Sequence, residues 1–147
     1  MKVEFHSGVA DKLDHTCRLL RKSQAAGAQV VVGGERALLD RLDVMLWTFD
    51  ALSFVPHLRV RGERPSASTA VLERTPLWLA DDPAACAARD VLVNLGPEMV
   101  AGWEGFARVI EVVGRDDDDS AAARQRWRAY GETAGVERVH HSLGEHR

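Results

Sequence analysis

The chain has 147 residues, of which 46% are hydrophobic, and this length and composition suit a single domain, residues 1–147, with a sizeable core. The net charge of −3 argues against wrapping of nucleic acid over a large surface, for which a basic domain is expected. No apolar leader segment and no run of about 18 apolar residues is present, so we expect a cytoplasmic protein without a membrane span. Two cysteines, Cys17 and Cys86, are too few for a disulfide framework, and we expect both to be reduced and buried.

Strand-forming and helix-forming patterns alternate along the chain. Val3 and Phe5 alternate with polar residues as in a strand, and Leu39, Leu42 and Leu46 form a helical stripe. The expected elements are strand 2–7, helix 10–26, strand 28–32, helix 36–49, short strand 56–60, loop 61–68, extended segments 69–74 and 76–80, polar connection 81–90, strand 91–96, helical turn 103–107, strand 108–113, a helix opened by 116–120 and ending at 130, and tail 136–141. Such alternation predicts an α/β fold, a three-layer sandwich with a mainly parallel sheet.

The glycine pair Gly33-Gly34 follows a strand and precedes a helix, which is where phosphate-binding loops occur. The pair lacks the Gly-Lys-Ser/Thr ending of a Walker loop, and the chain contains no G-x-G-x-x-G. A glycine pair after a strand is most often only a turn. The chain also lacks a nucleophile elbow or a Cys/His signature, so nothing here predicts an enzyme.

Metal-ligand spacing gives no candidate site. His140 and His141 are adjacent, so on a strand they point to opposite faces and cannot chelate together. Cys17 and Cys86 have no partner at zinc-site spacing, and no H-E-x-x-H is present. We therefore predict no metal and no cofactor.

Four consecutive aspartates, at 116–119, directly precede a helix. They could hold a divalent cation, but negative charge also stabilises the first turn of a helix, whose free N–H groups carry positive potential. We favour capping over metal binding, with Asp118, Asp119 or Ser120 as the N-cap.

The helix that follows carries arginines and aromatic residues at helical spacing. Arg124, Trp127 and Arg128 lie at i, i+3 and i+4 and so share one face, and Arg126 and Tyr130 form a second i, i+4 pair. We expect the alanines to pack on the sheet and the arginines to face water. Two interpretations stay open: a solvated basic face with a half-buried tryptophan, or an anion-binding patch beside an aromatic pocket.

Three segments together resemble the chi subunit of bacterial DNA polymerase III. They are LDVMLWTFDALSFVPH at 42–57, DVLVNLG at 90–96 and ARQRWRAYGETAGVERVHH at 123–141, and their order and spacing agree along nearly the whole chain. The resemblance implies a nucleotide-binding-like fold without a functional phosphate loop. It also implies a non-catalytic adaptor that links the clamp loader to the acidic C-terminal tail of single-stranded DNA-binding protein.

Carried over by the resemblance, the tail-binding residues are Arg124 and Trp127, with Arg128 as an adjacent basic position and Val113 as an apolar wall. An acidic tail that ends in phenylalanine needs arginines and an apolar slot. Two departures from the family pattern lower the positive potential here: Ser120 replaces a lysine, and the aspartates at 116–119 crowd the start of the helix.

The resemblance also implies that Trp47 and Phe54 bind the psi subunit, or a different clamp-loader or helicase-like partner where psi is absent. Phe49, by contrast, is assigned mainly to the core. Nucleic acid would be contacted only indirectly. The alternatives are a small α/β nucleotide-binding or hydrolytic enzyme that uses Gly33-Gly34, and direct binding of single-stranded DNA by the arginine and tryptophan face.

Overall fold

The protein is described here by a computed structural model that covers residues 1–48, 55–62, 74–86 and 90–143. The strands are β1 Lys2–Val9, β2 Val30–Gly33, β3 Leu58–Val60, β4 Leu77–Ala80, β5 Val91–Asn94, β6 Arg108–Gly114 and β7 Glu137–Ser142; the helices are α1 Lys12–Ala25, α2 Arg36–Thr48 and α4 Asp117–Gly131; and two 3₁₀ turns are η1 Pro83–Ala85 and η2 Trp103–Gly105. The predicted loop 61–68 and extended segment 69–74 lie largely outside the described residues, as do Phe49 and Phe54.

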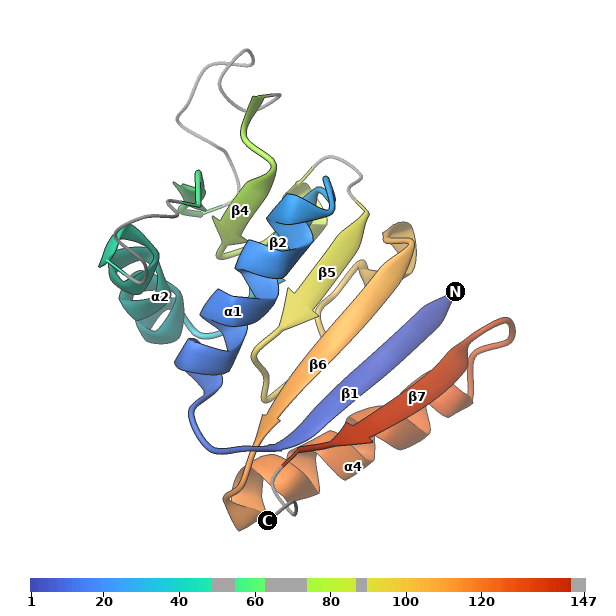
Figure 1. Ribbon diagram of the computed structural model, residues 1–147. Helices are drawn as coiled ribbons and strands as arrows, with labels where there is room; N and C mark the ends of the chain where they lie inside the picture. The colour runs from blue at the N-terminus through green and yellow to red at the C-terminus, as the bar shows by residue number, and fades with distance from the viewer. Residues whose placement is uncertain (49–54, 63–73, 87–89, 144–147) are drawn as a thin grey trace.

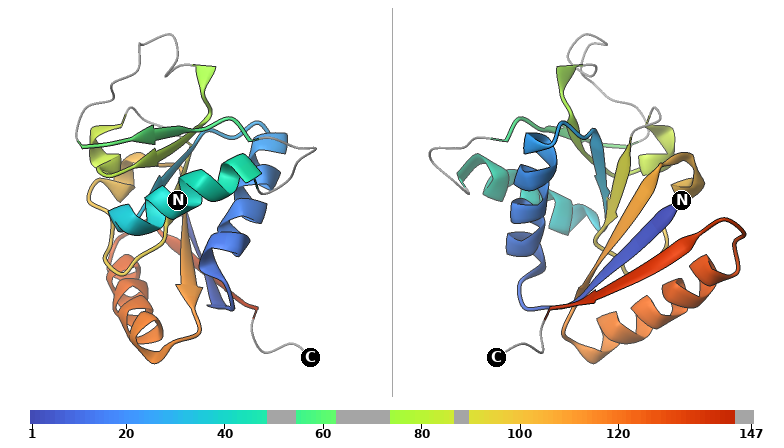
Figure 2. Two further views of the ribbon diagram at one scale, coloured as in Figure 1. Left: turned by 90° about the vertical axis from the view of Figure 1, so that its left-hand side faces the viewer. Right: turned by 45° about the vertical axis from the view of Figure 1, so that its right-hand side comes forward.

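The strands form one seven-stranded sheet in the order β3-β4-β2-β5-β6-β1-β7. Every pairing between neighbouring strands is parallel. Helices α1 and α2 lie on one face of the sheet and α4 lies on the other (Figures 1 and 2). This arrangement confirms the predicted α/β three-layer sandwich, in which both faces of a parallel sheet are covered.

The core is divided in two by the sheet. In β2, Val30 and Val32 pack toward α1 and α2, while Val31 between them packs toward the opposite layer. Successive side chains of a strand point to opposite faces, so a run of three valines supplies both cores. On the α4 side, the tightly packed aromatic ring of Tyr130 is fully buried.

The glycine pair after β2 has a packing role. A side chain at Gly33 would place its Cβ 2.8 Å from Pro83 Cγ, and one at Gly34 would lie 3.0 Å from Leu95 Cβ. Contacts this short are not tolerated, so glycine lets η1 and the end of β5 approach the turn closely. This role agrees with the absence of a phosphate-loop motif in the same segment.

The two cysteines differ in burial. Cys17 in α1 is fully buried, whereas Cys86 after η1 is only partly buried, so the expectation of two buried thiols is wrong for Cys86. Neither thiol forms a disulfide within the described part of the chain. Among the helices in the described part of the chain, none combines the length and the apolar character needed to cross a membrane.

A candidate peptide-binding pocket beside helix α4

A pocket of about 520 Å³ opens between α4 and the strands β1, β6 and β7. Its floor is apolar, because Phe5 of β1 and Val113 of β6 are almost completely buried beneath it. Trp127 and Ala123 of α4 form one wall, and the C-terminal half of β7 forms the other. The full lining is Phe5, Ser7, Gly8, Val113, Gly114, Arg115, Ser120, Ala123, Arg124, Trp127, His140 and Ser142.

The tryptophan ring is held from several sides. Phe5 meets Trp127 edge-on with 5.2 Å between ring centroids, and His140 lies at 6.2 Å. The guanidinium of Arg138 lies over the indole, 4.6 Å from its centroid, and donates a hydrogen bond to the Trp127 carbonyl. Edge-to-face and cation–π contacts of this kind fix ring orientation. The slot between Trp127 and the sheet is therefore preformed.

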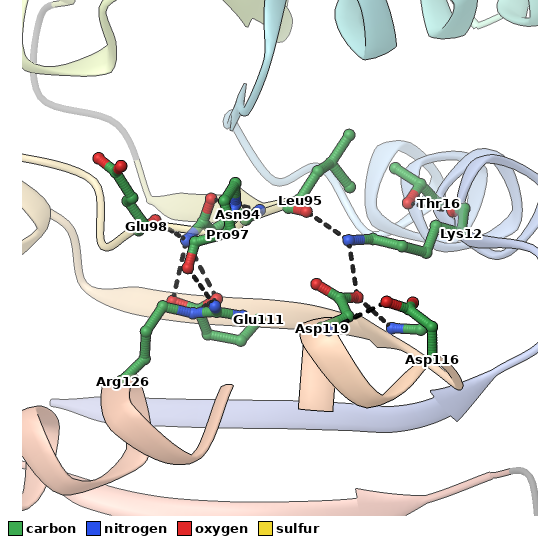
Figure 3. A network of polar contacts seen from close by, with 12 residues as sticks. Lys12, Thr16, Asn94, Leu95, Pro97, Glu98, Glu111, Asp116, Asp119 and Arg126 are labelled. Carbon is green, nitrogen blue, oxygen red and sulfur yellow. Dashed lines mark hydrogen bonds and ion pairs between the residues drawn. The ribbon is translucent and has the colours of Figure 1, made fainter. Parts of the chain in front are cut away.

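A buried ion pair holds α4 against the sheet (Figure 3). Arg126 Nε donates to Oε1 of Glu111 in β6 at 2.9 Å, and both side chains are at most 3% exposed. The Tyr130 hydroxyl donates to Oε2 of Glu111 at 2.6 Å, and Asn94 Nδ2 lies 3.1 Å from each carboxylate oxygen. The prediction that the arginines of this helix face water is thus wrong for Arg126, whose charge is paired inside.

The same network reaches the turn after β5. Arg126 also donates to the Pro97 carbonyl, and Asn94 Oδ1 accepts from the Gly96 N–H at 2.8 Å. Burial raises the pKa of Glu111, and Arg126, Tyr130 and Asn94 act against that rise. The hydrogen bonds fix α4 in one position and rotation, which sets the directions of Arg124 and Trp127.

The aspartates at the start of α4 have structural partners. Asp116 is the N-cap, and its side chain accepts from the Asp119 N–H at 3.0 Å, so capping is confirmed but the three residues expected as the cap are wrong. Asp119 accepts from the Gly114 N–H at 2.6 Å and pairs with Lys12 at 3.1 Å (Figure 3). The helix begins at Asp117, so the cap lies two to four residues earlier than expected, where its carboxylate can accept from a free N–H of the first turn.

None of these four aspartates belongs to the lining of the pocket. Asp116, Asp118 and Asp119 border a second, smaller hollow together with Lys12 and residues near Leu95. The charged side chains that line the first pocket are Arg115 and Arg124, both exposed at its rim. The pocket is therefore positive at its mouth although the chain is negative overall.

The structure brings together three of the four residues predicted for the tail site. Val113, Arg124 and Trp127 line the pocket, as does Ser120, whereas Arg128 is exposed on α4 outside the lining. Arg115, which was not predicted from the sequence, also lines the pocket and donates to the Gly8 carbonyl at 3.1 Å. One indication of its position at the site is present in the sequence, because Arg115 directly precedes Asp116, the N-cap of α4.

The residues predicted for a second partner lie elsewhere. Trp47 is on the last turn of α2 and is 62% exposed, and Val44, three residues earlier, is 63% exposed. The Trp47 ring meets His57 at 5.3 Å, and His57 Nε2 lies 3.0 Å from Asp43. Phe54, the other predicted contact, lies outside the described residues.

Comparison with known proteins identifies the family. The protein-family model described as "DNA polymerase III chi subunit, HolC" matches residues 1–137 of this chain. DNA polymerase III subunit chi of Pseudomonas aeruginosa is 33% identical over 122 residues, which cover 82% of this chain and 80% of that protein. The Escherichia coli K12 subunit is 29% identical over 115 residues, which cover 78% and 74%.

Solved structures add the fold alone. The C-terminal domain of the DEAD-box protein Dbp5 superposes with a TM-score of 0.66 at 10% identity, covering 97% of this chain and 90% of that one. The predicted family resemblance is confirmed by the sequence matches. The chain belongs to the chi subunit family of DNA polymerase III, whose members are accessory, non-catalytic subunits of the replication machinery.

Proposed function

We propose that this chi subunit is an adaptor that binds the acidic C-terminal tail of single-stranded DNA-binding protein in the pocket beside α4. The observation that carries the proposal is the combination of a preformed apolar slot with two arginines at its mouth. In this proposal the terminal phenylalanine ring enters the slot over Val113 and beside Trp127. Arg124 and Arg115 bind carboxylates of the tail.

The chemistry of the lining supports such a ligand. Arginine presents a planar fork of donors that matches a carboxylate, and it keeps its charge at any physiological pH. Ser7, Ser120 and Ser142 add hydroxyl groups around the opening. Arg128, one helical turn from Arg124, is proposed as an outer contact for acidic residues farther from the end of the tail.

The aspartates at 116–119 weaken this binding less than their number suggests. Asp119 is paired with Lys12, and three of the four border the other hollow. Ser120 supplies no charge where a lysine would. We therefore expect binding that depends strongly on two arginines and is reduced by salt, since exposed charges are screened over about 8–10 Å near physiological ionic strength.

A labelled peptide with several acidic residues and a C-terminal Pro-Phe tests the proposal by fluorescence anisotropy. Wild type should bind at low salt, and Arg124→Ala and Trp127→Ala should each weaken binding by about tenfold or more, as for loss of a charged anchor. Arg41→Ala, which removes an exposed arginine of α2 on the other face of the sheet, is the matched control. No binding to wild type at low salt would refute the proposal.

Two further measurements separate the tail from other ligands. An amidated peptide lacks the terminal carboxylate and should bind more weakly than the free acid. A single-stranded oligonucleotide should not displace the peptide. Displacement by the oligonucleotide, with the same loss in Arg124→Ala, would instead favour direct binding of single-stranded DNA.

We also propose that Trp47, with Phe54, binds a second replication protein, either psi or an equivalent part of the clamp loader. The exposure of Trp47 and Val44 on one face of α2 supports this proposal. Neighbouring apolar side chains that stay exposed on a monomer often mark a surface that binds a partner. We expect the protein to work in the cytoplasm. Trp47→Ala should abolish its co-purification with clamp-loader subunits. Unchanged co-purification would refute this assignment.

A further inference from the structure

Three potential metal ligands meet on the face of the sheet opposite the pocket. His6 of β1 and His141 of β7 are directly opposite each other in the strand pairing, and Glu4 lies two residues before His6 on the same face. One ligand atom from each of the three residues lies within 4.8 Å of the others. Alternation along the strands sends Phe5 and His140 the other way, into the pocket lining.

One separation inside this cluster matches the spacing of two ligands that share a cation. His141 Nε2 and Glu4 Oε1 are 3.4 Å apart, which is long for a hydrogen bond. Two ligands on a tetrahedral zinc ion, each at about 2.0–2.2 Å, are themselves separated by roughly 3.4 Å. The separation between His141 Nε2 and Glu4 Oε1 therefore matches the spacing of two ligands on one ion.

The neighbours of the cluster orient its side chains. Arg108 binds Oε2 of Glu4 and leaves Oε1 directed toward His141. His15 of α1 lies against His6, with 3.0 Å between His15 Nε2 and His6 Nδ1.

The cluster is also accessible. The side chain of His141 is 49% exposed on the edge strand β7, whereas that of Glu4 is only 7% exposed. An ion can reach the group from the open side of β7 without rearrangement of the core. The charge of Arg108 opposes a cation here, so a site that binds must rely on good ligands rather than on net negative charge.

We propose that Glu4, His6 and His141 form a binding site for a divalent transition-metal ion of the zinc class, with water completing its coordination. Two imidazole nitrogens and one carboxylate oxygen are a set that zinc commonly takes, whereas magnesium prefers oxygen ligands alone. His15 is a positioning residue, because its hydrogen bond holds the His6 ring. The bound ion would join the C-terminal strand β7 to β1.

The site is tested by isothermal titration of zinc into the protein. The protein carries no polyhistidine tag and is first stripped of metal with EDTA. Wild type should bind one ion per chain and magnesium none, and zinc should raise the thermal unfolding temperature, as a ligand of the native state does. His6→Gln and His141→Gln should remove saturable binding. His15→Gln should weaken it by about 10–100-fold, as for residues that orient a ligand.

A matched control uses a histidine next to the site in sequence. His140→Gln changes the neighbour that points to the opposite face, and this variant should bind zinc like wild type. Thermal unfolding of each variant in EDTA shows whether it is folded before zinc is added. No saturable binding by wild type, or an equal loss in His140→Gln and His141→Gln, would overturn the proposal.

Discussion

Glu111 and Arg126 form a charged pair that is almost completely removed from water. Ionised groups in such a place are stable only when their hydrogen-bonding capacity is met, and Tyr130 and Asn94 meet most of that of the carboxylate. The pair joins α4 to the middle of β6. Its role in the candidate site is indirect, because it fixes the helix on which Arg124 and Trp127 stand.

Arg126→Met should therefore lower the free energy of unfolding by about 3–5 kcal/mol, since it leaves a buried carboxylate without its counter-charge. Urea unfolding followed by circular dichroism measures the change. The double variant Glu111→Gln with Arg126→Met should lose less than Arg126→Met alone, because the amide carries no charge. A single-variant loss below about 1 kcal/mol, the range of surface pairs, would contradict this account.

The same variant should become sensitive to pH. Burial already raises the pKa of Glu111 above its ordinary value of 4.5, and loss of Arg126 removes the largest opposing effect. A carboxyl whose pKa is higher in the folded state binds a proton on folding, so stability is full below the unfolded pKa and falls as pH rises through the folded one. As pH rises above the ordinary carboxyl pKa, Arg126→Met should lose stability, whereas the double variant, which has no carboxyl at position 111, should not.

The two thiols should differ in reactivity. Burial, followed by the charges of Asp14 and Asp11, raises the pKa of Cys17 to about 11, so its thiol stays protonated near pH 8. Only the thiolate is nucleophilic, and Cys86 is more accessible. A thiol-specific chromogenic reagent should label one thiol quickly in the native protein and the second only after denaturation. Cys86→Ser should remove the fast reaction; equal rates for both thiols would contradict the prediction.

The burial of Arg126 could have been predicted from the sequence. Ala123, Arg126, Trp127 and Tyr130 lie at i, i+3, i+4 and i+7, the stripe that a helix turns toward its core. Grouping by chemical type put Arg126 with the exposed arginines instead. The tail-site residues Val113, Arg124 and Trp127 came from the family resemblance, whereas Arg115 and the buried network depend on how strands far apart in the chain meet.

At the scale of elements, the N-terminus of α4 is the best-defined junction. Asp116 caps the helix, and Asp119 ties the Gly114 N–H at the end of β6 to Lys12 of α1. The loop between β6 and α4 carries Arg115, and so this junction sets one side of the pocket mouth. Asp116 and Asp119 thus have separate structural roles, whereas Asp117 and Asp118 are exposed on the first turn, where the helix dipole favours their charge.

Asp116→Ala should destabilise the protein by about 1 kcal/mol, the usual effect of removing an N-cap side chain. Asp118→Ala is the matched control: it removes the same charge two residues later without a capping hydrogen bond, and its effect should stay within about 0.5 kcal/mol. Thermal or urea unfolding of both variants measures the difference. Equal losses would mean that charge near the dipole, and not the cap, accounts for the effect.

The sequence predicted the elements better than their arrangement. Apolar runs such as residues 28–32 identify central strands because both faces are buried. The exposed strand β7 was predicted only as a tail, since edge strands carry mixed residues and give a weak pattern. The order that puts β1 between β6 and β7 follows from contacts across the whole chain, and local periodicity contains no information about it.

At the scale of the whole molecule, charge and apolar surface are segregated. The rim arginines of the pocket lie beside α4, three of the aspartates border another hollow, and Trp47 is exposed on α2. Helices α2 and α4 lie on opposite faces of the sheet (Figure 2). A net charge of −3 therefore coexists with a locally positive site. Such separation suits an adaptor, because two partners can be held without competing for one surface.

The two proposed surfaces should consequently act independently. α2 packs near β3 and β4 at one end of the sheet, while the pocket is bordered by β6, β1 and β7 at the other end. Sites that share no contacting residues usually show additive effects, to within about 0.3–0.5 kcal/mol, which corresponds to roughly a twofold change in affinity. Trp47→Ala should thus leave the affinity for the acidic peptide unchanged within that range, and Arg124→Ala should leave co-purification with clamp-loader subunits intact.

The independence of the two surfaces can be measured directly by peptide anisotropy and by co-purification. Both measurements are made on Trp47→Ala, on Arg124→Ala and on the double variant. The double variant should combine both losses and show nothing further. A loss of peptide affinity well beyond twofold in Trp47→Ala, with thermal unfolding unchanged, would mean that the sheet couples the two surfaces. The adaptor would then regulate one partner through the other, because a coupling free energy between two sites acts equally in both directions.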